Sequence, residues 1–391
     1  MRHSNERVVL SLLRQHGALS KSDIARLTSL SAQTVSVIMR ALEAEGLLIK
    51  GEPQRGRIGQ PSVPMSLNPD GAYFLGLKIG RGSAELVLTD FLGRVRDKAE
   101  KRWVYPTPEE TRKFLISALG RMRAGLSPDQ GRRVAGLGIA MPFELWNWAE
   151  MLGARRDLMD QWRGHDIRAQ LQDELPFPVY LENDATSACG AELVFGRVGD
   201  LRDFVYFYIG ALVGGGVVLN GRLYSGPTNN AGALGSMPVP DADGKPVQLI
   251  DIASLTVLET RMRQSCRSVS HRWTDERAWQ EAGEVADIWI ADAGKALAVA
   301  IVSSAAVIDF EAAIIEGWMP PAIRKRIVEC ARAALRDLDA EGLQLPEIRE
   351  GTVGSHARAL GAASLPLSER FLVGSDTLPP GTADFFRVSG D

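Results

Sequence analysis

The chain has few cysteines and lacks any long apolar run. Its 391 residues include three cysteines, which are odd in number, far apart and without Cys-x-x-Cys spacing: Cys189, Cys266 and Cys330. This excludes a disulfide framework and argues against a cysteine zinc site. The absence of a run of about 18 apolar residues excludes a membrane-spanning helix of ordinary length. Residues 1–7 do not have the pattern of a signal peptide, so we expect a cytoplasmic location and no membrane partner.

The composition is that of an ordinary globular protein, but its charge is unevenly distributed. The chain is 45% hydrophobic and 24% charged, and it is long enough for two or three domains. Nine Lys and Arg against five Asp and Glu give residues 1–66 a charge of +4, so with a total of −3 the remaining residues carry −7. A mildly basic N-terminal part is expected if only that part contacts a phosphate backbone.

The N-terminal residues follow the pattern of a helix-turn-helix. Apolar residues at helical spacing predict a first helix over 6–15 and a third over 31–42. The second helix opens at Ser20 with a capping-box pattern, and a short turn over 28–30 follows it. Ser29 stands in this turn where glycine is commoner. The same arrangement occurs in modules that bind protein partners, so DNA binding is one of two interpretations of the pattern.

The third predicted helix has one apolar and one polar face. If the helix enters the major groove, its polar side and its start supply the expected DNA contacts: Ser31, Gln33, Thr34, Ser36 and Arg40.

Two short predicted strands next to these helices indicate a wing. The strands cover 47–50 and 63–67, and the glycine-rich loop between them carries Arg55 and Arg57. Arginines of a wing can reach phosphates or the minor groove, so we count both among the DNA contacts. The alternative is a flexible linker with incidental arginines.

From residue 69 the pattern changes to alternating strands and helices. The expected strands are 73–79, 84–90, 95–104, 134–140, 178–181 and 307–315, and the expected helices include 108–124, 166–175, 283–306, 320–338 and 354–363. The tail from residue 366 has no clear period.

A polar pair stands where the strand over 178–181 becomes a helix. Ligands of open α/β sheets collect at the carboxyl ends of strands, so Asn183 and Asp184 could hold a small polyhydroxylated molecule. Asn and Asp are also favoured helix N-caps, and capping alone would explain them.

Four blocks in order resemble the ROK family, which contains repressors, open reading frames and kinases. They are residues 136–142, 180–192, 209–226 and 230–239. The resemblance implies an α/β actin-like (ribonuclease H-like) two-lobed sugar-kinase fold, preceded by an all-α/winged helix-turn-helix domain. We expect the DNA-binding domain at 1–68, the first lobe at 69–182, the second at 183–365 with its last helix returning to the first lobe, and a tail at 366–391.

Both phosphate-binding turns of the family's kinases are altered. The resemblance aligns the acidic residue of the first turn with Lys78 and its second glycine with Arg81, while Ala211 and Leu212 replace Thr and Gly in the second turn. Phosphate turns need backbone N–H groups free to approach the anion, together with hydroxyls or carboxylates that organise Mg²⁺. We therefore expect no ATP cofactor and no catalytic residue.

The family's sugar site is retained only in part. Asp184 matches the kinases' general base, and without ATP it would accept hydrogen bonds from sugar hydroxyls beside Asn183. A family glutamate becomes Ala233, and the histidine that contacts sugar and zinc becomes Ser236. A further sugar-contacting glutamate falls beside Asp251, and the zinc-binding cysteines are absent. The expected effector contacts are Asn183, Asp184, Ser236 and Asp251, with no metal.

Together these patterns favour a sugar-responsive DNA-binding transcriptional regulator, a repressor that is not an enzyme. Its expected partners are a double-stranded DNA operator, a sugar or sugar derivative as effector, and further copies of the chain in a homodimer or dimer of dimers. One alternative is an ATP-dependent sugar kinase of the ROK family that acquired a DNA-binding domain. Another is a ligand-independent DNA-binding regulator.

Overall fold

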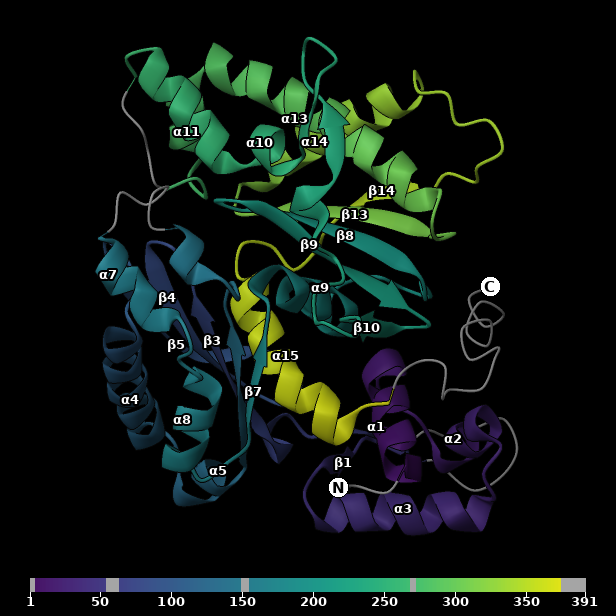
Figure 1. The fold of residues 1–391 in the computed structure, drawn as a ribbon. Helices are drawn as coiled ribbons and strands as arrows, with labels where there is room; N and C mark the ends of the chain where they lie inside the picture. Colours follow the sequence, from purple (N-terminus) through teal and green to yellow (C-terminus); the bar gives the residue numbers. More distant parts are fainter. Residues whose placement is uncertain (1–3, 54–62, 149–154, 268–271, 374–391) are drawn as a thin grey trace. The chain divides into compact units, whose positions relative to one another are not determined.

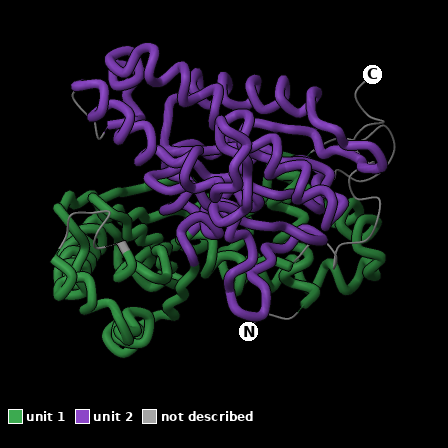
Figure 2. The backbone as a smooth tube through the Cα atoms, turned by 45° about the horizontal axis from the view of Figure 1, so that its top comes forward, with its two compact units in different colours: residues 1–182, 362–391 green, residues 183–361 purple. Residues whose placement is uncertain are grey.

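The computed structural model describes residues 4–53, 63–148, 155–267 and 272–373 (Figure 1). The chain divides into two compact units, residues 1–182 with 362–391 and residues 183–361 (Figure 2). Residues 1–68, which we call the head, belong to the first unit together with the first lobe. A separate domain at 1–68 therefore stays a prediction.

The head contains the three expected helices. They are α1 (Ser4–His16), α2 (Lys21–Thr28) and α3 (Ala32–Ala44). The capping box at the start of α2 is confirmed, because the Ser20 side chain accepts the Asp23 N–H and the Asp23 carboxylate accepts the Ser20 N–H. Ser29 ends α2 with a φ of 57°, in the left-handed region where glycine would be unstrained.

The two strands expected beside the helices pair with each other. β1 (Leu48–Lys50) and β2 (Met65–Leu67) are antiparallel, and Met65 also exchanges backbone hydrogen bonds with Leu19 on its other edge. The loop between them lies largely outside the described residues, and so do the predicted contacts Arg55 and Arg57.

The first lobe is a five-stranded sheet in the order β5-β4-β3-β6-β7. Its strands are β3 (Tyr73–Ile79), β4 (Ser83–Thr89), β5 (Val95–Arg102), β6 (Val134–Ala140) and β7 (Val179–Glu182). β3, β4 and β5 are antiparallel neighbours, whereas β6 and β7 run parallel to β3. One apolar cluster joins the sheet to α4 (Pro108–Ala124) and α8 (Ile167–Glu174). The short helices α5 (Pro128–Arg132) and α7 (Arg156–Met159) lie in the connections.

The second unit repeats this strand topology in the order β10-β9-β8-β13-β14. Its strands are β8 (Phe204–Ile209), β9 (Val213–Leu219), β10 (Arg222–Tyr224), β13 (Ala312–Gly317) and β14 (Glu347–Glu350). The small hairpin β11 (Pro238–Pro240) and β12 (Pro246–Gln248) is separate. Three strands are again antiparallel and two run parallel. Two units of one topology are what a sugar-kinase-type fold requires.

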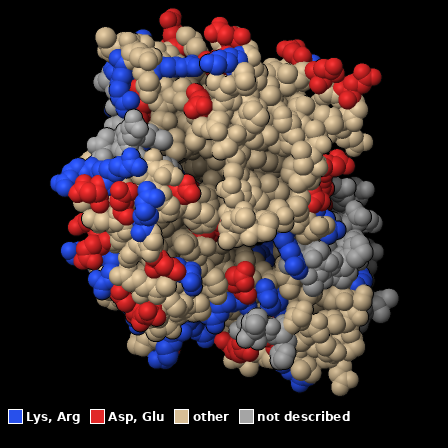
Figure 3. Space-filling view, in the orientation of Figure 1, with Lys and Arg blue, Asp and Glu red and all other residues tan. Residues whose placement is uncertain are grey.

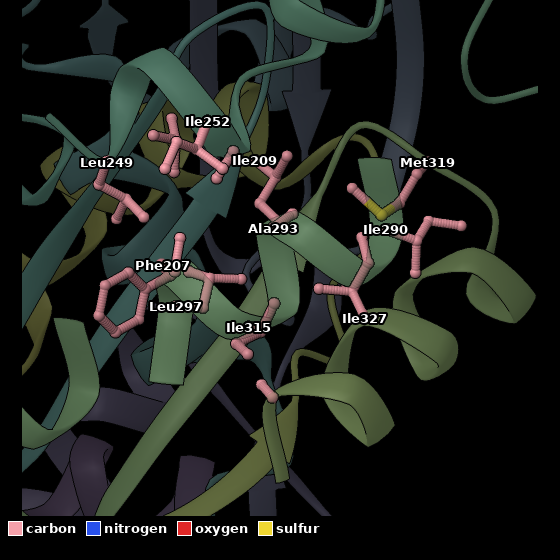
Figure 4. Packing of buried hydrophobic residues seen from close by; sticks show 14 of the residues in the cluster. Phe207, Ile209, Leu249, Ile252, Ile290, Ala293, Leu297, Ile315, Met319 and Ile327 are labelled. Atoms are coloured by element: carbon pink, nitrogen blue, oxygen red, sulfur yellow. The ribbon is translucent and has the colours of Figure 1, made fainter. Parts of the chain in front are cut away.

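Helices bury the sheet of the second unit. The larger core lies under α13 (Glu284–Ala305) and α14 (Pro321–Leu335), where Leu297 and Ile327 pack with strand residues Phe207 and Ile315 (Figure 4). The short helices α10 (Ile250–Ala253), α11 (Leu255–Gln264) and α12 (Glu276–Ala282) contribute to the same core. A second cluster packs α9 (Asp184–Phe195) against β8 and β9.

Two expectations about secondary structure were wrong. The strand expected over 307–315 begins only at Ala312, and Val307 is 82% exposed in the connection that follows α13. The last helix, expected over 354–363, is α15 (Ala357–Phe371), so the first residues of the expected irregular tail are helical. Among the described residues, no helix is long and apolar enough to cross a membrane.

The end of α15 contacts α1 of the head within the first unit. Arg7 donates to the carbonyl oxygens of Ser368, at 3.1 Å, and Leu372, at 2.7 Å. The Phe371 ring lies edge-on to Phe91, with 5.1 Å between the centroids. Arg14 of α1 donates to the Phe91 carbonyl, and burial lowers the pKa of Arg14 to about 10, which still leaves it charged at neutral pH.

Candidate DNA-binding and effector sites

The polar side of α3 is exposed as the sequence predicts. Gln33 and Arg40 are exposed, while Val35, Ile38, Met39 and Leu42 are buried on the other side. Ser31 is the N-cap, and its hydroxyl accepts the Thr34 N–H at 3.1 Å, so this predicted contact also has a structural task. Thr34 and Ser36 are half-buried.

The sequence pattern did not predict two residues at the exposed side of α3. Lys21, at the start of α2, is exposed and donates from Nζ to the Ser36 hydroxyl at 3.3 Å. Val37 is 55% exposed although it is apolar. Its spacing of four residues from Gln33 could have revealed it, whereas the position of Lys21 depends on how α2 packs against α3. On the face seen in Figure 3, Lys and Arg side chains are interspersed with Asp and Glu side chains.

Asn183 is the N-cap of α9. Its Oδ1 accepts the N–H groups of Ala185, at 3.0 Å, and Thr186, at 3.4 Å. The capping interpretation therefore explains Asn183 without a ligand.

Asp184 forms an ion pair that the sequence did not predict. Arg358, in the first turn of α15, places Nη1 3.0 Å from Asp184 Oδ2. The two side chains are only 13% and 15% exposed, so water screens the pair poorly. The Arg358 guanidinium also lies over the Tyr208 ring, 5.1 Å from its centroid, in a cation–π contact. The carboxylate is thus neutralised from within the protein.

The glycines of β9 serve packing. A Cβ on Gly214 would lie 2.9 Å from Ala185 Cβ, and one on Gly216 would lie 2.5 Å from Cys189 Cβ. Strand residues alternate between faces, so Gly215 points to the other side, where a Cβ would meet Leu234 at 2.4 Å. Close approach of α9 explains Gly214 and Gly216, and the packing of Leu234 on the other face explains Gly215, without any phosphate.

Residues of both altered phosphate turns make hydrogen bonds with neighbouring groups of the protein. In the second turn the carbonyls of Gly210 and Ala211 accept the N–H groups of Leu255 and Thr256, at 3.0 and 3.1 Å. These N–H groups begin α11 and would otherwise be available to an anion. In the first turn Lys78, which the resemblance aligns with the family's acidic residue, donates from Nζ to the Ser83 hydroxyl at 3.1 Å.

The other two predicted effector contacts, Ser236 and Asp251, are exposed residues. Ser236 ends a short 3-10 helix, Leu234–Ser236, and Asp251 accepts the Gln248 N–H at 3.2 Å at the start of α10. Their role in binding stays a prediction. Within the described ranges, no three His, Cys, Asp or Glu side chains are grouped so as to hold a metal ion.

Two buried carboxylates fix the loop that leads to Arg358. Glu192 of α9 accepts the Thr352 N–H at 3.0 Å and the Val353 N–H at 3.2 Å. Glu316, at the end of β13, accepts the Gly354 N–H at 2.9 Å and pairs with Arg324. Burial raises the pKa of Glu192 despite these hydrogen bonds. The sequence pattern did not predict this arrangement, because the partners come from distant elements.

The geometry agrees with two family models. The model described as the ROK family matches residues 74–369, most of the chain. The chain belongs to the ROK family. A second model, winged helix-turn-helix DNA-binding, matches residues 2–49 and therefore covers all three helices of the head.

Curated relatives of this ROK protein include named repressors. An uncharacterized protein, y4fQ, of Sinorhizobium fredii is 25% identical over 95% of this chain and 92% of its own length. The xylose repressor of Bacillus subtilis is 23% identical over 60% of each chain. The DNA-binding transcriptional dual regulator NagC of Escherichia coli is 26% identical over 60% of this chain and 57% of its own. The match to these two named relatives thus spans 60% or less of their length.

Solved structures share the fold and include both regulators and kinases. A ROK family transcriptional regulator, homolog of E. coli MLC protein, has a TM-score of 0.66 at 19% identity, over 93% of this chain and 95% of that one. A ROK family glucokinase from Streptomyces griseus, in complex with glucose and AMPPNP, has a TM-score of 0.58 at 20% identity, over 75% and 99%. These identities establish the fold alone, a sugar-kinase-like α/β fold with an N-terminal helix-turn-helix region.

Proposed function

We propose that this ROK protein is a DNA-binding transcriptional repressor whose ROK domain senses a sugar or sugar derivative and does not phosphorylate it. Its partners would be a double-stranded operator, the effector and a second copy of the chain, as a homodimer or dimer of dimers. Since it acts on DNA, we place it in the cytoplasm. The names of the relatives and the winged helix-turn-helix match support this function.

The observation that carries the proposal is the surface of α3. A helix that is buried on one side and exposes Gln33 and Arg40 on the other, after a capped α2 and a tight turn, has the form of a recognition helix. Gln pairs with adenine and Arg with guanine in the major groove. Lys21 next to α3 suits a phosphate contact.

Effector control would follow from linkage. A ligand that favours one conformation of the ROK domain changes the placement of the two heads in a dimer. The heads must meet two half-sites at a fixed spacing on DNA, so the affinity for the operator changes as well. The altered phosphate turns support sensing over catalysis, because Lys78 and Arg81 stand in the first turn and Ala211 and Leu212 in the second, in place of the residues that the resemblance leads us to expect.

The test is selection of bound fragments from the source genome by the purified protein, followed by fluorescence anisotropy across a salt series. We expect tight, sequence-selective binding that weakens as salt rises. Arg40→Ala should weaken binding and relax selectivity at one base pair, whereas Arg123→Ala, at an exposed position of α4, should do neither. If folded protein selects no sequence, the proposed function fails.

A thermal shift measurement separates the sensor from a ligand-independent regulator. A real effector adds RT ln(1 + [L]/Kd) to the free energy of unfolding and so raises the melting temperature. Sugars that are taken up or used by the products of genes beside the selected fragment should therefore stabilise the protein. Stabilisation by none of them, with DNA binding intact, would favour the ligand-independent alternative.

A further inference from the structure

The exposed side of α3 contains an apolar side chain that packing does not explain. Val37 is 55% exposed, whereas Val35, Ile38 and Met39 of the same helix are at most 9% exposed. Valine is also a weaker helix former than alanine or the long polar residues, so neither burial nor helix propensity accounts for it at this position.

Val37 lies among the side chains that would face DNA. Residues three and four apart are neighbours on a helix surface, so Val37 lies between Gln33, four residues before it, and Arg40, three residues after it. Gln33 and Arg40 are both exposed. Ser36, next to Val37 in the chain, accepts a hydrogen bond from Lys21. An apolar side chain is thus flanked by groups suited to base edges and phosphate.

The major groove offers one apolar group to such a side chain, the 5-methyl group of thymine. We propose that Val37 reads a thymine methyl in each operator half-site, close to the base pair that Gln33 contacts, because the two residues are one α-helical turn apart on α3. The proposal rests on the proposed function, because it assumes that α3 enters the major groove. It identifies a base-specific contact that involves no hydrogen bond.

The experiment replaces thymines of the selected operator, one at a time, by deoxyuridine, which lacks only the 5-methyl group. Binding of the full-length protein to each duplex is measured by anisotropy at fixed salt. We expect one thymine per half-site at which the replacement weakens binding about four-fold, the value of burying one methyl group. In Val37→Ala the difference in binding between that duplex and the thymine duplex should become smaller, because alanine offers less apolar surface to the methyl group.

A matched control variant and the response of each duplex test whether Val37 contacts a thymine methyl. Val95→Ala changes a valine that is 45% exposed in β5, and it should keep the full sensitivity to deoxyuridine. The inference is overturned if wild-type protein is insensitive at every thymine, or if Val37→Ala stays fully sensitive. It is also overturned if Val37→Ala weakens all duplexes alike, as expected for contact with a protein partner. Selective DNA binding without methyl sensitivity leaves the proposed function intact, whereas failure to select any DNA removes both.

Discussion

Arg358 and Asp184 form an ion pair, 174 residues apart in the chain, with 3.0 Å between Nη1 and Oδ2. The pair joins the first turn of α15 to the first turn of α9. Asp184 is the carboxylate that the family resemblance assigns to sugar hydroxyls, and in this protein its charge is already balanced. A ligand at this position must therefore compete with Arg358 or add to the pair.

The Asp184–Arg358 pair should contribute measurably to stability. We expect a coupling free energy of about 1–3 kcal/mol between Asp184→Asn and Arg358→Met in a double-mutant cycle, because water screens this pair poorly and a lone partner would be left without its counter-charge. The measurement is the free energy of unfolding in urea for the wild type, both single variants and the double variant.

A surface pair provides the control for that cycle. Arg155 and Asp157 also form an ion pair, but their side chains are 72% and 60% exposed. Their coupling should be clearly weaker, because water and salt screen exposed charges. Equal coupling in the two cycles would mean that Asp184 is as well hydrated as a surface residue, and the structural account of the pair would be wrong.

Gly216 should not tolerate a side chain. A Cβ at this position would lie 2.5 Å from Cys189 Cβ, so Gly216→Ala should lower the free energy of unfolding by about 1–3 kcal/mol through overpacking. Gly120→Ala, in α4, meets nothing within 4 Å and should raise it by about 0.5–1 kcal/mol, because alanine favours the helix. Urea unfolding of both variants tests the opposite signs.

Sequence patterns predicted those parts of the fold that depend on neighbouring residues in the chain. The limits of α4, from the proline at its start to Ala124, and the strands β3 and β6 follow from periodicity and start signals. The N-cap role of Asn183 was also open to prediction, because residue type and position suffice for it. The ion pair of Asp184 was not, since it depends on where the tertiary fold places α15.

The two errors in secondary structure also have physical causes. Val307 and Ile308 are β-branched, so the strand was predicted to begin too early in the chain. These two residues lie in the connection that follows α13. The tail from residue 366 was expected to be irregular because it has no clear period, and Pro366 lies inside α15 although proline removes a helical hydrogen bond. The helix continues because Phe371 packs edge-on against Phe74 and Phe91, which a periodicity argument does not capture.

Ser29 should be replaceable by glycine with a gain in stability. Its φ of 57° is unfavourable for any residue with a Cβ, so Ser29→Gly should raise the free energy of unfolding by about 0.5–1 kcal/mol after the greater freedom of the unfolded glycine is counted. Ser22→Gly, inside α2, should lower it by about 0.5 kcal/mol. A loss of stability in Ser29→Gly would mean that the turn does not adopt this conformation.

Glu192 should make stability depend on pH. Burial raises its pKa above the ordinary 4.5, so the folded protein binds this proton more tightly than the unfolded chain does. Stability from this group is therefore present in acid and falls as pH rises above about 4.5. Relative to Glu192→Gln, the free energy of unfolding of the wild type should decrease between pH 4 and pH 7.

Glu347 gives a control of opposite sign. A hydrogen bond from Arg349 holds the pKa of Glu347 below its ordinary value, so its stabilisation is present above that value and is lost as pH falls. Relative to Glu347→Gln, the wild type should gain stability between pH 3 and pH 6. The same sign of change at both positions would contradict the contrast between a buried and an exposed carboxylate.

Sugar-dependent ATP hydrolysis should be absent. A variant of Arg358 separates two possible reasons for this, the altered phosphate turns and the ion pair that holds Asp184. The kinase alternative predicts hydrolysis that requires a sugar and disappears in Asp184→Asn. We expect wild type and Asp184→Asn to show the same background rate in a coupled assay across a panel of sugars. Arg358→Met frees the Asp184 carboxylate but leaves the altered turns at Lys78 and Ala211 unchanged, so it should stay inactive as well. If Arg358→Met instead gains sugar-dependent hydrolysis, the phosphate turns still bind ATP, and the ion pair alone keeps a kinase silent.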